Sequence, residues 1–372
     1  MLVVTSVALT LGLVELGSWI WVTKLRPQHL TQWEFRATQP LPYQGADYFG
    51  PAFLAEAEAS VSGRISTIAE LRDFKGRYFN VVNGFRVTTD APPDPERRVL
   101  MFGGSTLFGQ EVPDRYTIAS YLQRMLNEEG VRWQVRNFGL PGMNTAQQTL
   151  ILKRIRLKAG DIVVFYHGVN DIYYLVFGGY EEGWVSGTPA FRPVQKLSAL
   201  HKWLHAWHEH LKDYSYTAQV ALDIYQRGQP ETVTDPDQLR HSLANAEAHF
   251  RAALREAAEI THEAGADFVH FLQPTAFSGA RLTAYEHDIL KNPLTTAPGV
   301  EIAFREGYPQ LREVAVALEG EGIDFDDISD ALNGRTDGDE VYLDFCHLNH
   351  EGNRLIAERM MDVYFRPLIM LH

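Results

Sequence analysis

The chain has 372 residues, of which 45% are hydrophobic and 22% are charged, and its formal net charge is −13. This length allows one large α/β domain with additions or two modest domains, and the composition is that of a globular protein. The negative charge would repel a phosphate backbone, so we expect no nucleic-acid partner. The single cysteine, Cys346, excludes an intramolecular disulfide and a cysteine-rich zinc site.

The N-terminal segment is apolar. Residues 2–22 form a run long enough to cross a bilayer as a helix, and Glu15 is the one charge inside it. Neither a basic leader nor a small-residue cleavage site is obvious, which favours an uncleaved membrane anchor at 1–24 over a signal peptide or a buried core helix. Lys24 and Arg26 follow the run, so the positive-inside rule, taken literally, places the rest of the chain in the cytoplasm.

Two further regions follow the anchor. Residues 25–95 are mixed in character and are interpreted as an N-terminal extension that ends in a proline-rich linker. In 96–372, buried strands alternate with helices, which predicts a parallel sheet in a catalytic domain, interrupted by an aromatic insertion at about 173–237. The predicted strands lie at 99–102, 133–138, 161–166, 267–274 and from Val341, and the predicted helices at 118–126, 144–157, 239–265, 308–319 and 352–365.

Ser105 lies in the segment FGGSTLFG, directly after the first strand of that domain. Gly103 and Gly104 let the backbone turn sharply and present the hydroxyl beside backbone N–H groups, which suits a nucleophile. The same pattern is also common where a strand simply leads into a capped helix. The Gly-x-Ser-x-Gly elbow is absent, because position 107 is leucine.

An acid and a histidine lie close together near the C-terminus, in LDFCHLNHEG. Asp344 and His347 are three residues apart in a loop, a spacing that lets the carboxylate accept from one ring nitrogen while the other nitrogen faces a hydroxyl. The alternative is a surface aspartate and histidine at the start of a helix.

Two more segments follow strands and offer hydrogen-bond donors. In GVND, Asn170 can aim its amide at a developing oxyanion, although an Asx turn gives the same pattern. In NFGLPGMNT, Gly139 or Gly142 can offer a backbone N–H, and the spacing favours Gly142. The carboxyl ends of strands are where open α/β sheets bind ligands, so the four segments are expected to converge there.

In their order along the chain, GGST, NFGLPG, GVND and the C-terminal DxxH resemble the blocks of the SGNH (GDSL-like) hydrolase superfamily, over residues 80–365. The preceding NGFR at 83–86 is similar to the lead-in of membrane-anchored bacterial members. The resemblance implies a three-layer α/β/α fold with a flavodoxin-like sheet. It also implies roles for the residues already singled out. These are Ser105 as nucleophile, His347 as general base, Asp344 as its orienter, and the Ser105 N–H, Gly142 N–H and Asn170 side chain as the oxyanion hole. The family's usual Gly-Asp-Ser is Gly-Gly-Ser here, so any role of that aspartate is absent.

The function that this resemblance implies is hydrolysis of O-acyl esters, including O-acetyl esters, through an acyl-enzyme. An O-acyltransferase that modifies an envelope polysaccharide and a non-catalytic scaffold are the alternatives. The resemblance places the catalytic domain outside the cytoplasm, against the literal charge rule, with the membrane and a small or polysaccharide ester as partners. We expect no cofactor and no metal, and interpret the histidine-rich LHKWLHAWHEHLKDY, which contains His201, His205, His208 and His210, as a solvated amphipathic helix.

Overall fold

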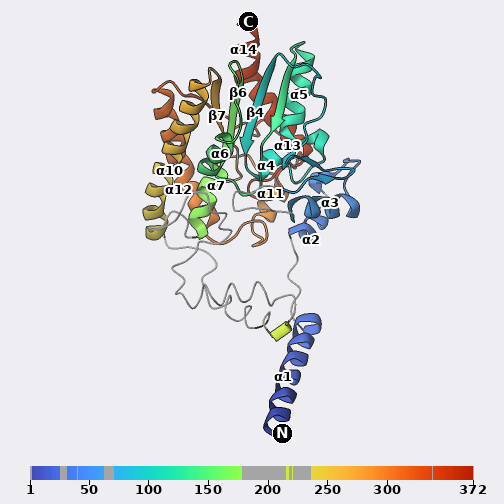
Figure 1. Cartoon of the computed structure of the whole chain (residues 1–372). Coiled ribbons are helices and arrows are strands. Elements are labelled where there is room, and N and C mark those ends of the chain that lie inside the picture. Colours follow the sequence, from blue (N-terminus) through green and yellow to red (C-terminus); the bar gives the residue numbers. More distant parts are fainter. Residues whose placement is uncertain are drawn as a thin grey trace.

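The structure is a computed structural model, and it describes residues 2–25, 32–39, 41–62, 71–177, 215–217, 220, 236–336 and 338–371. Its centre is a parallel five-stranded sheet in the spatial order β5-β4-β6-β7-β8 (Figure 1). The strands are β4 (Arg97–Gly103), β5 (Trp133–Asn137), β6 (Ile162–His167), β7 (Asp267–Leu272) and β8 (Asp324–Asp327). The predicted α/β class with a parallel sheet is therefore confirmed.

The strand order places a crevice at one end of the sheet. Numbered along the chain, the order is 2-1-3-4-5, the doubly wound order of flavodoxin-like folds. In such sheets the carboxyl ends of the first and third strands, here β4 and β6, flank the point where the connections diverge. Gly103 and Tyr166 are register partners at these two ends. The segments that follow these strands therefore lie beside each other.

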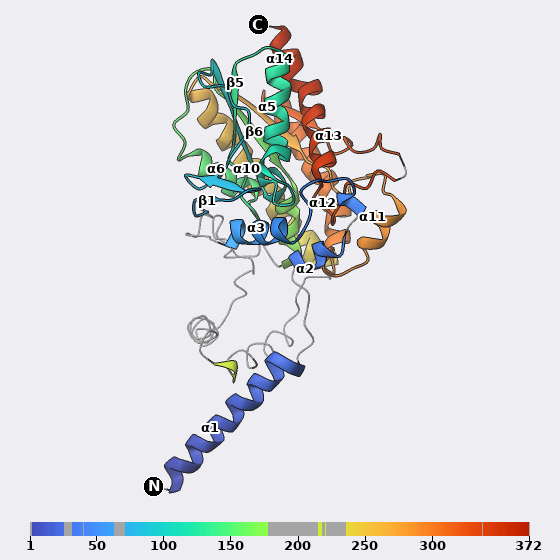
Figure 2. The ribbon, with the colours of Figure 1, turned by 90° about the vertical axis from the view of Figure 1, so that its right-hand side faces the viewer.

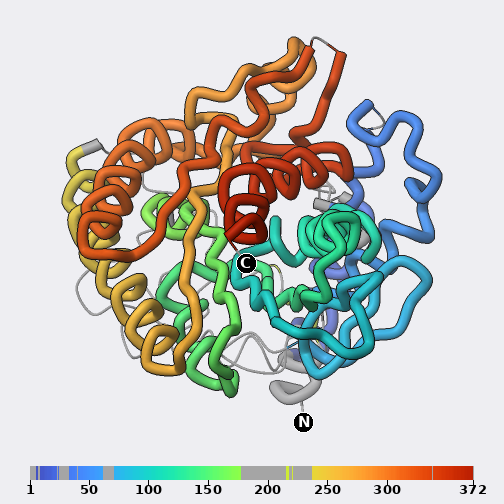
Figure 3. Tube along the Cα trace, turned by 90° about the horizontal axis from the view of Figure 1, so that it is seen from above, coloured from blue at the N-terminus to red at the C-terminus, as the bar shows by residue number. Residues whose placement is uncertain are grey.

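Helices cover both faces of the sheet (Figure 3). One group is α6 (Thr145–Leu152), α10 (Pro236–Glu263) and α12 (Val300–Glu319), and the other is α5 (Ile118–Glu128) and α13 (His350–Met360). Every residue of β6 is buried, as expected for a strand covered on both sides. Phe102, Phe165 and Phe268 form a row of ring contacts, with centroids 5.4 and 5.3 Å apart, and anchor the core to the sheet.

The N-terminal extension is folded against the sheet domain. It contains α2 (Gln32–Ala37), α3 (Pro51–Ser62) and a small antiparallel sheet of β1 (Phe74–Lys75), β2 (Asn80–Val82) and β3 (Phe85–Arg86). Asn83 and Gly84 have φ values of 53° and 80°, which the two-residue turn between β2 and β3 requires. Figure 2 shows α2 and α3 at the end of the sheet domain where α11 (Ala284–Ile289) also lies.

The extension has an aromatic core of its own. Its buried members pack together with Leu343, a residue of the C-terminal part of the chain. The members from the extension are Trp33, Tyr43, Tyr48, Phe53, Ala57 and Phe79. The extension therefore packs on the loop that carries Asp344, although Leu343 and Trp33 are far apart in the sequence.

The predicted membrane segment forms α1 (Leu2–Ile20), followed by a π-helical turn, η1 (Trp21–Leu25). The Glu15 carboxylate accepts hydrogen bonds from Ser215 Oγ at 3.0 Å and from the Thr217 N–H at 3.2 Å. Among the described residues, no helix is both long enough and apolar enough to cross a bilayer. The helix is present, but the predicted transmembrane span is not supported, and the location outside the cytoplasm stays a prediction.

Three predicted elements differ from the structure. The strand expected from Val341 does not form, because the Val341 and Tyr342 N–H groups both donate to the Glu286 carboxylate at 2.9 Å, and only an isolated bridge joins Tyr342 to Leu348. The last strand of the sheet is instead β8. Helix α12 begins at Val300 rather than at 308, and α6 ends at Leu152 rather than at 157. Most of the aromatic insertion at about 173–237 lies outside the described residues.

Candidate active site

Ser105 is the first residue of the short helix α4 (Ser105–Phe108), which follows β4 directly. Two glycines make this turn possible. A Cβ on Gly103 would lie 2.8 Å from the Tyr166 carbonyl oxygen, and a Cβ on Gly104 would lie 2.4 Å from Asn170 Nδ2. Both distances are too short for a side chain, so the Gly-Gly-Ser sequence is what lets β6 and its following loop approach Ser105.

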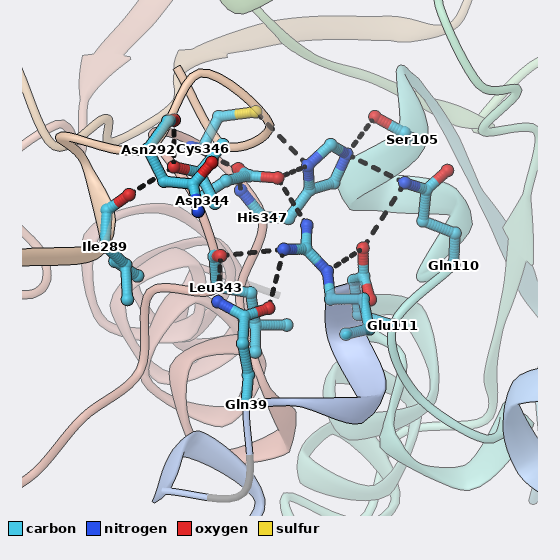
Figure 4. A network of polar contacts seen from close by, with 12 residues as sticks. Gln39, Ser105, Gln110, Glu111, Ile289, Asn292, Leu343, Asp344, Cys346 and His347 are labelled. Atoms are coloured by element: carbon cyan, nitrogen blue, oxygen red, sulfur yellow. Dashed lines mark hydrogen bonds and ion pairs between the residues drawn. The ribbon is translucent and has the colours of Figure 1, made fainter. Parts of the chain in front are cut away.

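Ser105, His347 and Asp344 form one hydrogen-bonded chain (Figure 4). Ser105 Oγ lies 2.7 Å from His347 Nε2, and His347 Nδ1 lies 2.7 Å from Asp344 Oδ2. If Nδ1 carries the proton and donates to the carboxylate, Nε2 is free to accept from the Ser105 hydroxyl. Gln110 Nε2 lies 3.1 Å from the same ring nitrogen. The structure therefore brings together residues that are more than 200 positions apart in the sequence.

The three-residue spacing of Asp344 and His347 follows from the shape of their loop. Asp344 Oδ1 accepts the N–H groups of Cys346 at 2.9 Å and of His347 at 2.8 Å, which closes an Asx-type turn. The other carboxylate oxygen is thereby turned toward the imidazole. Asn349 then caps α13 by accepting the Gly352 N–H at 2.9 Å, which fixes the chain just after the histidine.

Arg36 of α2 is a part of this site that sequence reasoning missed. Its side chain is 1% exposed and donates to Asp344 Oδ2, to Glu111 Oε1 at 3.1 Å and to the Leu343 carbonyl at 2.7 Å. Figure 4 shows Glu111 and Leu343 in the network around Asp344 and His347. No motif surrounds Arg36 in the sequence, so no local signal could have identified it.

The charges of this network shift the pKa values of both partners. Burial opposes ionisation of Asp344, but the charges of His347 and Arg36 and the hydrogen bonds to its oxygens outweigh burial and hold the pKa of Asp344 well below its usual range. Burial also opposes protonation of His347, yet the charge and hydrogen bond of Asp344 leave the pKa of His347 above its ordinary value. Asp344 is therefore a carboxylate at neutral pH, and His347 is a strengthened base.

Donor groups face Ser105 from two other loops. Asn170, in α7 (Val169–Tyr173), lies beside Gly104 and donates from Nδ2 to the Met143 carbonyl at 3.0 Å. Gly142 has a φ of 75° and lines the same cavity as Ser105 and Asn170. No acceptor for the Gly142 N–H is present among the described residues. This N–H is therefore available to an incoming oxygen.

Gly139, the alternative to Gly142, is used differently. Its N–H donates to Asn137 Oδ1 at 2.8 Å, and a Cβ at this position would lie 2.5 Å from the Phe108 backbone nitrogen. Gly139 is thus a close contact between the loop after β5 and α4, and its N–H is not free for a ligand. Of the two glycines, Gly139 has its N–H engaged by Asn137, so Gly142 is the one that can still donate to a ligand, and its role in an oxyanion hole stays a prediction.

Two side chains tie the donor loops together. Asp171 accepts from the Thr145 N–H at 3.0 Å, from Thr145 Oγ1 at 2.9 Å and from the Gly168 N–H at 3.3 Å. Its burial raises the pKa of Asp171 to about 6, against the opposing effect of these hydrogen bonds. Tyr174 donates from its hydroxyl to the Gly142 carbonyl. The loops after β5 and β6 are therefore held in a fixed relation.

Ser105, Gly142, Asn170 and His347 line a cavity of about 250 Å³. Its walls are largely apolar, and they include Tyr173 and Phe345, whose stacked rings have centroids 5.4 Å apart. The rest of the wall comes from Gln110, Pro141, Val169, Tyr174, Pro293, Leu294, Thr295, Ala297, Asp344 and Cys346. A ligand with an apolar group could pack against these walls beside the Ser105 hydroxyl, in the same cavity that Asn170 and His347 line.

The same residues are a poor metal site. Asp344, Cys346 and His347 offer one ligand atom each within 4.8 Å of one another. However, Arg36 already pairs with Asp344 as a cation, and burial raises the pKa of the Cys346 thiol well above its usual value, which keeps it protonated. The histidines at 201, 205, 208 and 210, which the sequence places on one predicted helix, lie outside the described residues.

Comparison with known proteins gives structural similarities only. No protein-family model matches the sequence, and no curated protein is significantly similar to it. Among solved structures it resembles a lipolytic protein of the G-D-S-L family from Veillonella parvula, with 14% identity, a TM-score of 0.40, and coverage of 73% of this chain and 99% of that one. An acetylxylan esterase from Geobacillus stearothermophilus has 12% identity, a TM-score of 0.40, and coverage of 72% and 94%.

A G-D-S-L family protein from Desulfitobacterium hafniense is also similar, with 15% identity, a TM-score of 0.37, and coverage of 72% of this chain and 98% of that one. Two of these three structures thus carry the name of the family that the sequence motifs resemble. At these identities and TM-scores the similarity carries no information about substrate.

Proposed function

We propose that the chain is a serine ester hydrolase in which Ser105 is the nucleophile and His347 the general base. The observation that carries this proposal is the continuous hydrogen-bonded chain from Ser105 Oγ through the His347 ring to Asp344, with 2.7 Å at each step. A histidine that only happened to lie near a serine on the surface would not have both of its ring nitrogens engaged. The pKa of Asp344 is strongly lowered, and a carboxylate of this kind stabilises the imidazolium that forms in such a chain.

The mechanism follows from the positions of these atoms. His347 Nε2 removes the Ser105 proton while Oγ attacks the ester carbonyl, and the carbonyl oxygen becomes an oxyanion. The Ser105 N–H, the Gly142 N–H and the Asn170 amide donate to that oxygen. The imidazolium then protonates the departing alcohol, which leaves an acyl group on Ser105. Water, deprotonated by the same nitrogen, releases the acid and restores the serine.

Asn170 can donate to the oxyanion without giving up its present hydrogen bond. Its Nδ2 now donates to the Met143 carbonyl, and an amide nitrogen carries a second hydrogen that can turn to the oxyanion. The Met143 bond therefore holds the amide in place rather than removing it from the reaction.

The substrate that we propose is a short O-acyl ester, such as an O-acetyl group on a polysaccharide. The cavity of about 250 Å³ has room for a small acyl group against Tyr173 and Phe345. The polysaccharide follows from the family resemblance alone. Transfer of the acyl group to a sugar hydroxyl would use the same groups, so product analysis with and without an acceptor sugar distinguishes the two reactions.

A fluorophosphonate probe tests the proposal most directly, since it labels only an activated serine. We expect the full chain to be labelled at Ser105 and to hydrolyse p-nitrophenyl acetate, and we expect Ser105→Ala to lose both properties. Ser242→Ala is a suitable control, because Ser242 is a buried serine of α10 that is not among the residues lining the cavity. An unlabelled parent chain that is folded would instead indicate a non-catalytic scaffold.

A further inference from the structure

Arg36 belongs to the N-terminal extension, yet it contacts the carboxylate that orients the proposed base. We propose that Arg36 is a positioning residue of the active site, which fixes Asp344 and sets the proton affinity of His347. This inference rests on the proposed ester hydrolysis. It makes the extension a working part of the site rather than a linker before it.

The contacts of the guanidinium are directional. One terminal nitrogen donates to Asp344 Oδ2, the same oxygen that His347 Nδ1 contacts at 2.7 Å. The other terminal nitrogen donates to the Leu343 carbonyl at 2.7 Å, one residue before the aspartate. Arg36 therefore holds both the side chain of Asp344 and the backbone that carries it. A lysine has a single point of charge and cannot make these bonds in parallel.

Other groups keep the guanidinium itself from moving. Gln39 Oε1 accepts from Arg36 Nη1 at 2.9 Å, and the Gln39 amide donates to the same Leu343 carbonyl at 2.8 Å. Glu111 Oε1 accepts from Arg36 Nε at 3.1 Å. The side chain of Arg36 is 1% exposed, so these bonds are made away from solvent and are little screened.

The charged and titratable groups around His347 come from several parts of the chain. Arg36 faces it from α2, Glu111 from the loop after α4, and Asp344 and the protonated Cys346 thiol from its own loop. Tyr173 of α7 lines the same cavity, and the Tyr43 hydroxyl donates to Glu111 Oε2 at 3.2 Å. The charged set is one cation and two carboxylates. Protonation of His347 during attack brings the whole set to neutrality, whereas without Arg36 two carboxylates would face the ring.

Arg36 and Glu111 therefore act on His347 in opposite directions. The positive charge of Arg36 lowers the proton affinity of the imidazole, and the negative charge of Glu111 raises it. A base that binds its proton too tightly is already protonated at neutral pH and cannot accept the Ser105 proton. Arg36 thus limits the rise in the pKa of His347 that Asp344 and Glu111 cause, so that without Arg36 the ring would stay protonated to higher pH.

The test is the pH dependence of kcat/KM for p-nitrophenyl acetate, measured on the unlabelled full chain. A separate sample, labelled with the fluorophosphonate, first establishes that Ser105 is reactive. In Arg36→Gln, the acid limb should move to higher pH by about one unit, because removal of a nearby charge of the same sign as the imidazolium raises the pKa of His347. In Glu111→Gln it should move to lower pH. The double variant should lie between them, near the parent.

Two further variants separate positioning from folding. Arg36→Lys keeps the charge and should leave the limb in place while lowering kcat more than it raises KM. Arg98→Gln removes another ion pair to a buried carboxylate, Arg98 Nε to Asp161 Oδ1 at 2.8 Å, at the amino end of β4, and should leave the limb unmoved.

An Arg36→Gln variant that loses kcat/KM equally at every pH would overturn the inference, because that is the behaviour of a purely structural residue. If Arg36→Gln does not fold, Glu111→Gln decides, and an unmoved limb in that variant has the same meaning. A parent chain without labelled Ser105 would instead refute the proposed function and leave the pH test without an activity to measure.

Discussion

Replacement of Gly104 by alanine should damage catalysis far more than stability. The added Cβ would lie 2.4 Å from Asn170 Nδ2, whereas ordinary contact begins at 3.4 Å, so the amide must move by about 1 Å. Gly104 has a φ of −85°, on the side of the map open to every L residue, and the backbone alone does not resist the change. The strain therefore falls on one short side chain.

The two costs can be estimated separately. Displacement of Asn170 breaks its hydrogen bond to the Met143 carbonyl, which contributes about 1 kcal/mol to the unfolding free energy. Displacement of an oxyanion donor by about 1 Å lowers the rate about 10²-fold. We therefore expect kcat for p-nitrophenyl acetate to fall about 10²-fold with KM little changed. The midpoint of urea unfolding should move only slightly.

A matched control and a double variant make the result decisive. Gly103→Ala brings its Cβ within 2.8 Å of the Tyr166 carbonyl, a backbone atom that cannot turn aside, so this variant should lose stability first. In Asn170→Ala, the side chain that clashes is absent, and adding Gly104→Ala should then lower kcat little further. If Gly104→Ala lowers kcat equally with and without Asn170, the reasoning about that amide is wrong.

Three other substitutions test separate parts of the structure. Tyr174→Phe removes the hydroxyl that donates to the Gly142 carbonyl, and steady-state kinetics should show kcat lowered about 10-fold with the fold intact; an unchanged kcat would mean that Gly142 needs no such brace. Glu286→Ala leaves the buried Arg335 without its ion pair, at 2.7 Å in the parent, so the unfolding free energy in urea should fall by about 3–5 kcal/mol, and a loss below about 1 kcal/mol would contradict a structural role. His270→Phe concerns the buried pair in which His167 Nε2 lies 3.1 Å from His270 Nδ1, where burial lowers both pKa values, that of His270 to about 3. The unfolded chain binds protons at these histidines from about pH 6.5 downward, whereas the folded chain does not. The unfolding free energy of the parent should therefore fall with decreasing pH by about 1.4 kcal/mol per pH unit for each histidine. The variant should show a smaller slope, and equal slopes would count against the pair.

The centre of the sheet could be predicted well from the sequence. The strands predicted at 99–102 and 161–166 are β4 and β6, because a run of apolar residues bounded by polar turns is typical of a strand that is buried on both faces in an α/β chain. One edge strand of the sheet, β8, was not predicted. β8 has the sequence DFDD and buries only Phe325, so neither apolar content nor alternation marks it as a strand.

The start of α12 was missed for a different reason. Pro309 is compatible with a helix that begins near it, since proline is favoured in the first turn of a helix. In the structure Pro309 lies inside the helix, and the preceding turns are held by packing. A Cβ on Gly307 would lie 2.5 Å from Ile172, which shows how closely α12 approaches α7. Tertiary packing of this kind leaves no local pattern in the sequence.

The candidate site divides in the same way. Ser105, Asn170, Asp344 and His347 lie in short motifs and were predicted from them, and the structure brings their side chains to one cavity. Arg36 could not be predicted, because its importance comes from a contact 308 positions along the chain. A lone arginine in a short helix has no property that distinguishes it from a surface residue until the fold buries it.

The packing of Leu343 among the aromatic residues of the extension has a consequence for anyone who divides this protein. A recombinant fragment that starts at the first strand of the parallel sheet would keep the serine, the histidine and the aspartate, but it would expose an apolar side chain next to the aspartate and leave Glu111 without its cation. Such a fragment would contain the four motifs from which the site was predicted and would still lack Arg36, which holds Asp344 in place. The smallest unit worth expressing therefore begins before Trp33.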